Sequence, residues 1–81
     1  MDLKEYIEFL VSSLVPNNEL IKVEIMANED EFQTVEILVP EDQMKYIIGK
    51  GGKNSHALRT LVNSYVYLHK LKKVKINIEA F

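Results

Sequence analysis

Residues 47–53 read Ile-Ile-Gly-Lys-Gly-Gly-Lys, and they lie between two segments with helical patterns. Glycine has no side chain, so the three glycines allow positive φ angles and let another molecule's backbone come close. The two lysines place positive charge at the same point. A helix expected over residues 54–69 directs its unpaired N–H groups and the positive end of its dipole there as well. This stretch therefore predicts a site for phosphate groups.

The two segments beside this loop have amphipathic patterns. Pro40, Glu41 and Asp42 suit the first turn of a short helix that ends at Gly49, where glycine stops it. In the helix after the loop, the residues expected to be buried are Leu58, Leu61, Val62, Tyr65 and Leu68. A basic connection follows, and residues 74–78 then alternate apolar and polar side chains as a half-buried strand does.

The N-terminal half supplies a helix and two strands. Apolar residues at helical spacing predict a helix over residues 2–15, with a capping arrangement of Asp2 and Glu5 and an end before Pro16. Alternation predicts strands near residues 20–26 and 34–39, joined as a hairpin by the acidic turn at residues 28–31. Because its spacing matches no calcium loop, we interpret that turn as solvated rather than metal-binding.

The element order α-β-β-α-α-β predicts an α+β fold. The first two strands should pair antiparallel, and two helices between the second and third strands leave room for a right-handed parallel crossover. Each strand has one apolar face, which the helices must cover. We therefore expect a three-stranded mixed sheet with helices packed on one face, and a single domain over residues 1–81.

Charge is divided unevenly between the halves of the chain. Residues 1–42 carry a net charge of −9 and residues 43–81 a net charge of +7, within an overall charge of −2. Such asymmetry indicates that the second half faces an anion, although ordinary solvated faces stay possible. The chain has no cysteine, no signal-like start and no apolar run of membrane length. We therefore expect a soluble, cytoplasmic protein.

The motif Gly49-Lys50-Gly51-Gly52 between two helices, after a hairpin and before a last strand, resembles the G-x-x-G signature of the KH domain. The element order resembles the type II variant. The initial helix, the Pro40 entry, the loop and Ala57-Leu58-Arg59 are similar to the KhpA-like group of small bacterial RNA-binding proteins.

This resemblance implies single-stranded RNA binding, in which the loop clamps the backbone of about four nucleotides. It also implies a homodimer, or pairing with a KhpB-type KH protein, and a role as RNA chaperone or regulator that influences bacterial growth and cell shape. The residues expected to contact RNA are Ile48, Gly49, Lys50, Gly51, Gly52, Lys53, His56 and Arg59. Ile47, Ile48 and Leu58 are expected to form the apolar wall of the groove.

Asn54 departs from the KhpA-like pattern, which usually has an aliphatic residue there. The substitution could alter an RNA groove or a dimer contact, or Asn54 could cap the helix that begins at the loop. We favour capping, because asparagine is among the preferred N-cap residues.

Other functions fit the sequence less well. A nucleotide-binding P-loop needs four residues between its glycines and Ser or Thr after its lysine, and this chain has neither. His56 and His69 are thirteen residues apart on one helix and cannot share a metal. We therefore expect no catalysis, no metal site and no cofactor. The main alternative is a KH-folded protein-interaction module with weak or no RNA binding.

Overall fold

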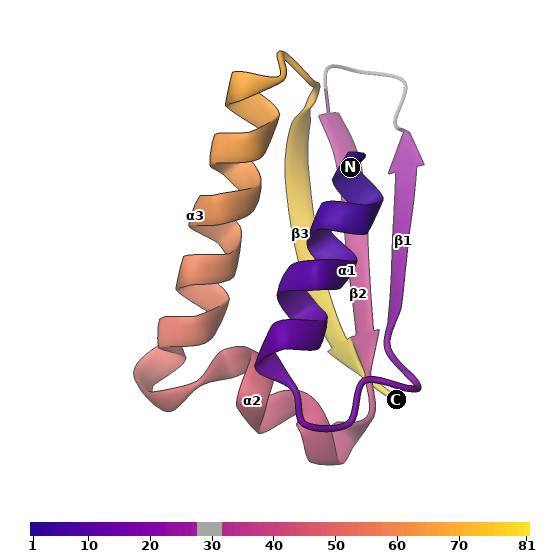
Figure 1. The fold of residues 1–81 in the computed structure, drawn as a ribbon, viewed down its shortest axis with the longest axis vertical. Helices are drawn as coiled ribbons and strands as arrows, with labels where there is room; N and C mark the ends of the chain where they lie inside the picture. The colour runs from indigo at the N-terminus through magenta and orange to yellow at the C-terminus, as the bar shows by residue number, and fades with distance from the viewer. Residues whose placement is uncertain (28–31) are drawn as a thin grey trace.

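Three α-helices cover one face of a three-stranded sheet in the computed structural model, which describes residues 1–27 and 32–81 (Figure 1). The sheet order is β1-β2-β3, with β1 antiparallel and β3 parallel to β2. This arrangement confirms the predicted α+β fold and mixed sheet. The elements are α1 (Leu3–Leu14), β1 (Lys22–Ala27), β2 (Phe32–Val39), the 3₁₀ turn η1 (Glu41–Gln43), α2 (Met44–Ile48), the 3₁₀ turn η2 (Lys50–Gly52), α3 (Lys53–Leu68) and β3 (Lys73–Ala80).

Both ends of α1 follow from the sequence. The Asp2 carboxylate accepts a hydrogen bond from the N–H of Glu5 at 2.8 Å, and the Glu5 carboxylate accepts one from the N–H of Asp2 at 3.2 Å. This is the predicted capping box. Val15 is extended, as the residue before a proline prefers to be, so the helix ends there.

β2 is the central strand, and the apolar residues of β1 and β3 lie beside those of β2 on the same face of the sheet. Val23 of β1 lies opposite Ile37, and Ile76 of β3 lies beside Val35. The predicted hairpin is confirmed, and the acidic turn at residues 28–31 lies outside the described residues. β2 and β3 are longer than predicted, and β1 begins and ends later in the chain than predicted. β1 and β3 form the two edges of the sheet.

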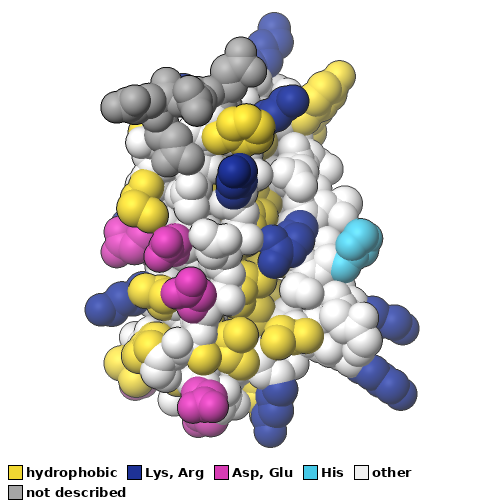
Figure 2. Space-filling view, turned by 180° about the vertical axis from the view of Figure 1, so that it is seen from behind, with side chains coloured by type: hydrophobic (Ala, Val, Ile, Leu, Met, Phe, Trp, Pro, Cys, Tyr) yellow, Lys and Arg dark blue, Asp and Glu magenta, His cyan; other side chains and the backbone are white. Residues whose placement is uncertain are grey.

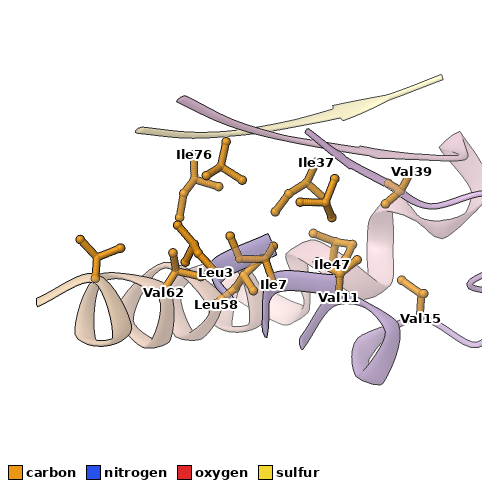
Figure 3. Packing of buried hydrophobic residues seen from close by; sticks show 13 residues of the cluster. Leu3, Ile7, Val11, Val15, Ile37, Val39, Ile47, Leu58, Val62 and Ile76 are labelled. Carbon is orange, nitrogen blue, oxygen red and sulfur yellow. The ribbon is translucent and has the colours of Figure 1, made fainter. Parts of the chain in front are cut away.

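The core lies between the sheet and the helices (Figure 3). Helix α1 contributes Leu3, Ile7 and Val11, and Val15 directly follows the helix. These side chains point toward Ile37, Val39 and Ile76 of the sheet and Ile47 of α2. Full burial of a side chain of this size stabilises a fold by about 1.5–3 kcal/mol. The core therefore fixes α1 and α3 against the sheet and leaves the loop between α2 and α3 at one end of the molecule (Figure 1).

The buried stripe of α3 differs from the prediction. The buried residues are Leu58, Val62 and Val66, spaced four apart, whereas Leu61 and Leu68 are exposed. The prediction was wrong for these two: Leu68 is 75% exposed, and Leu61 is 44% exposed beside an open groove between α1 and α3. Tyr65 is half-buried, and its ring stacks on Tyr6 of α1 at a centroid distance of 4.7 Å.

Two contacts hold the segment that leads into the loop. The N–H of Asn17, in the connection after α1, donates to the side-chain oxygen of the buried Gln43 at 3.2 Å. The N–H of Glu41 donates to the carbonyl of Phe81 at 3.1 Å, which places the C-terminus beside η1. The predicted short helix begins here, but Pro40 is the N-cap of η1 and not part of its first turn, and α2 continues directly from η1.

Candidate nucleic-acid interface

Gly49 ends α2 in a conformation that is essentially restricted to glycine, with φ 73° and ψ 172°. Its N–H donates to the carbonyl of Lys45 at 2.9 Å, which closes the helix. A Cβ atom at this position would lie 2.6 Å from Cγ of Asn54. The start of α3 therefore packs against the backbone at Gly49, and no side chain fits between them.

The next two glycines turn the chain into α3. Gly51 (φ 64°) and Gly52 (φ 78°) both have left-handed backbone angles. The N–H of Gly52 donates to the carbonyl of Gly49 at 3.2 Å, so this amide is occupied within the loop. Gly51 is exposed, and no heavy atom lies within 4 Å of the point that a Cβ atom would occupy. The loop is therefore tight at Gly49 and open at Gly51.

The outer side of the loop offers backbone hydrogen-bond donors. No acceptor in residues 1–27 and 32–81 receives a hydrogen bond from the N–H of Lys50 or of Gly51. Both residues are exposed, and so is Lys53 in the first turn of α3. The positive end of the 16-residue α3 dipole adds to these two ammonium groups. Free amides beside cations form a chemically suitable site for a phosphate.

Asn54 does not cap α3, which begins one residue earlier at Lys53. The N-cap of α3 is Gly52, and no side chain caps it. Instead, the Asn54 amide nitrogen donates at 2.8 Å to the carbonyl of Tyr46, near the end of α2, where carbonyls lack partners within the helix. The prediction that Asn54 caps α3 was wrong. Asn54 lies inside the first turn of α3, and its side chain bonds back to α2. Sequence spacing gives no signal for a contact of this kind.

Replacement of Asn54 by alanine is expected to lower the free energy of unfolding by about 1 kcal/mol, because the half-buried Tyr46 carbonyl would lose its partner. Urea denaturation measures this change. Ser64→Ala is a matched control on the same helix, since the exposed Ser64 hydroxyl bonds only to the Thr60 carbonyl one turn before it. An equal loss in both variants would contradict the link between α2 and α3.

Arg59 spans the gap between α3 and the edge strand β3. Its Nη1 atom donates to the carbonyl of Ile76 at 2.8 Å. A guanidinium carries five N–H donors, so one bond leaves the others available to an anion. His56, one turn closer to the loop, is exposed. The predicted residues from Gly49 to Arg59 thus form one continuous strip, which begins at the loop and continues up α3 beside β3.

The apolar residues beside the loop are divided between core and surface. Ile48 is 42% exposed next to Gly49, whereas Ile47 and Leu58 are 0% and 2% exposed. The prediction that all three form a groove wall was wrong for Ile47 and Leu58. Both side chains are buried in the core between the helices and the sheet, and Leu58 also lies at the floor of a groove between α1 and α3. Ile48 therefore offers apolar surface next to the glycines.

Charges are separated on the surface as they are in the sequence. In the view from behind the sheet, most Lys and Arg side chains lie toward the top and along the right side, where α3 runs (Figure 2). The carboxylates lie on the left and at the bottom. The strip that contains the loop and α3 therefore presents positive charge to an approaching anion.

The remaining candidate groups do not form a second centre. His69 stacks on Tyr65 at a centroid distance of 4.1 Å, on the same helix as His56 but thirteen residues further along. Within the described residues, no three His, Asp or Glu side chains gather as a metal ion requires. None of the described helices is both long and apolar enough to cross a membrane.

Comparison with known proteins matches residues 4–78 to the family model of the KhpA/KhpB KH domain. Similar proteins named "RNA-binding protein KhpA" come from Mycobacterium bovis (strain ATCC BAA-935 / AF2122/97) and from the CDC 1551 and H37Rv strains of Mycobacterium tuberculosis. Each is 38% identical over 56 residues, which is 69% of this chain and 69% of the relative. The family match spans the glycine loop and every helix and strand, in part or whole. The chain therefore belongs to the KhpA/KhpB KH-domain family.

Proposed function

We propose that this protein binds single-stranded RNA through the glycine loop and catalyses no reaction. The observation that carries the proposal is the exposed outer side of the loop, where the N–H groups of Lys50 and Gly51 have no acceptor among the described residues. The names of the mycobacterial relatives describe RNA-binding proteins. A KH loop clamps the backbone of about four nucleotides, and two free amides with two lysines suit that task.

Each candidate residue has a role in this proposal. Gly49 and Gly52 shape the loop, and Gly51 keeps its outer side open to a sugar-phosphate backbone. Lys50 and Lys53 contact phosphates. Farther along the strip, His56 and Arg59 face the following nucleotides, and Ile48 contacts a base by its exposed apolar surface. The set is Ile48, Gly49, Lys50, Gly51, Gly52, Lys53, His56 and Arg59.

The salt dependence of binding tests this proposal. Each phosphate contact with a single strand changes the logarithm of the binding constant by about −0.7 per tenfold rise in salt, so a site of this size should give a slope of about −2 to −4. Fluorescence anisotropy of a labelled single-stranded RNA at several salt concentrations measures it. A slope near zero, or no binding at low salt, would refute phosphate clamping.

A second KH domain, either a copy of this chain or a KhpB-type protein, is the protein partner that we propose. An apolar groove between α1 and α3 supports this; it is lined by Leu10, Ser13, Leu14, Asn54, Ala57, Leu58 and Leu61. Leu61 is exposed there, and Phe9 is exposed nearby on α1. The groove also favours the alternative of a protein-interaction module. Mass measurement in solution with and without RNA separates the two functions, because the alternative predicts protein complexes and no RNA complex.

In the cell, we propose that the protein acts in the cytoplasm as an RNA chaperone or post-transcriptional regulator that affects growth and cell shape. Sequencing of RNA crosslinked to the protein in living cells would test this role. RNA recovered at the level of an uncrosslinked control would contradict it.

A further inference from the structure

A second cluster of cations and apolar side chains lies at the far end of α3 from the glycine loop. Tyr67 is 83% exposed, and Leu71, just after the helix, is exposed as well. Both line a pocket together with Asn63, Val66, Lys70 and Lys73. Residues 63–75 include four lysines and no carboxylate. This segment of the chain therefore combines an exposed aromatic ring with several positive charges.

The turn after α3 holds this cluster in place. The N–H of Leu71 donates to the carbonyl of Val66 at 2.9 Å, and the N–H of Lys70 donates to the carbonyl of Tyr67 at 3.2 Å. Lys70 has a φ of +54°, in the left-handed region where glycine usually ends a helix. A side chain there costs about 1 kcal/mol relative to glycine. The chain thus keeps a lysine at a position that favours glycine.

The cluster continues the strip that begins at the glycine loop. His56, Arg59, Asn63 and Tyr67 are spaced three or four apart, so they lie on one side of α3. The Arg59 bond to Ile76 sets this side beside β3, and Asn63, Tyr67 and Lys73 line the same pocket. From Lys53 to Tyr67 the helix rises about 21 Å. The pocket is therefore well beyond the reach of the loop itself.

A second aromatic ring with a lysine lies on the neighbouring strand. Lys73 of β3 is in register with Phe32 of β2, and Nζ of Lys75 lies 5.4 Å from the centre of the Phe32 ring. Figure 2 shows dark-blue cations and yellow apolar groups close together in the upper part of this face. Aromatic rings interleaved with lysines are the pattern by which proteins hold single strands, since bases stack on rings and phosphates meet ammonium groups.

We propose that this cluster is a second RNA subsite, in which Tyr67 stacks on a base and Lys70 and Lys73 contact phosphates of the nucleotides that follow those at the loop. The inference rests on the proposed function of the loop and extends it: the preferred ligand is a single strand longer than the loop alone can hold. Stacking is tolerant of sequence, because every base has a flat face. The subsite therefore contributes affinity and length preference rather than base selection.

Titration with two RNA lengths tests the subsite. One RNA has about four nucleotides, enough for the loop, and the other has about twelve, within the range of extended single-strand sites. Tyr67→Ala should weaken binding of the longer RNA about fivefold or more, as loss of one base stack does. Tyr67→Phe keeps the ring and should bind as the unaltered protein does. Binding of the short RNA, followed by NMR titration, should be the same in all three proteins.

The lysines are tested by the salt slope. Lys70→Gln with Lys73→Gln should reduce the magnitude of the slope for the longer RNA by about 1.4, at about 0.7 per contact. Lys4→Gln with Lys22→Gln, in α1 and on the opposite edge strand β1, is the matched control and should leave the slope unchanged.

The outcomes separate the subsite from the loop. If the short RNA binds and Tyr67→Ala leaves affinity for the longer RNA unchanged, the subsite is overturned, the loop function stands, and an acidic protein becomes the candidate partner of the cluster. If Tyr67→Ala weakens both lengths equally, the subsite is also overturned. If the unaltered protein binds neither RNA, both proposals fail.

Discussion

Replacement of Lys50 and Gly51 by aspartate is expected to abolish binding of single-stranded RNA and to leave the fold intact. The change places two carboxylates where the loop would meet a phosphate, and it removes one ammonium group. Like charges brought together at an interface cost several kcal/mol, so affinity should fall by roughly 100-fold or more. Gel-shift or anisotropy titration measures the loss.

The loop geometry explains why this variant should fold. The side chain at position 50 is exposed, and no atom lies within 4 Å of a Cβ placed on Gly51. Aspartate is also among the residues that tolerate the left-handed conformation. Circular dichroism and thermal denaturation check the fold. Lys4→Asp with Lys22→Gln is a control that changes the net charge by the same amount, since both lysines are exposed and lie in α1 and β1. Unchanged RNA affinity in the loop variant, or an equal loss in the control, would refute the assignment.

Replacement of Gly49 by alanine is expected to lower the free energy of unfolding by about 3 kcal/mol. The backbone at Gly49 has a conformation that side-chain-bearing residues avoid, and the new Cβ would lie 2.6 Å from Cγ and 2.9 Å from the backbone nitrogen of Asn54. Relief would require α3 to move away from the end of α2. For a domain of this size, the melting temperature should fall by roughly 12–24 °C.

Gly51→Ala is the matched control for this prediction. It also adds one methyl group at a positive φ, but into open space, and should cost about 1 kcal/mol. Asn54→Ala in the Gly49→Ala background should restore little of the lost stability. The Cβ and the backbone nitrogen of residue 54 would still lie 2.9 Å from the new Cβ at position 49. If Gly49→Ala and Gly51→Ala lowered the free energy of unfolding equally, contact with Asn54 would not be the cause of the destabilisation.

The order of the elements could be predicted because each one has a local signal. Asp2 and Glu5 mark the start of α1, Pro16 marks its end, and alternation of apolar residues identifies the strands. The exposure of Leu61 and Leu68 could not be predicted in this way. Helical spacing indicates which residues share a face, but the width of the buried stripe depends on which elements pack against it.

The position of the candidate site could also be predicted from the sequence, but the separate roles of its glycines could not. Three glycines and two lysines locate the loop in the sequence. Whether a glycine is required for packing or for access depends on distances across the chain, as the contrast between Gly49 and Gly51 illustrates. The contacts of Asn54 with Tyr46 and of Arg59 with Ile76 join residues of different elements, and no sequence pattern indicates them.

The bond between Arg59 and the Ile76 carbonyl has a consequence for aggregation. An edge strand offers unpaired backbone groups onto which a strand from a neighbouring molecule can add, and proteins often block such edges with charged side chains. Arg59 occupies one acceptor of β3 with a cation. Variants that lack this arginine would therefore be more prone to aggregate by strand addition at β3.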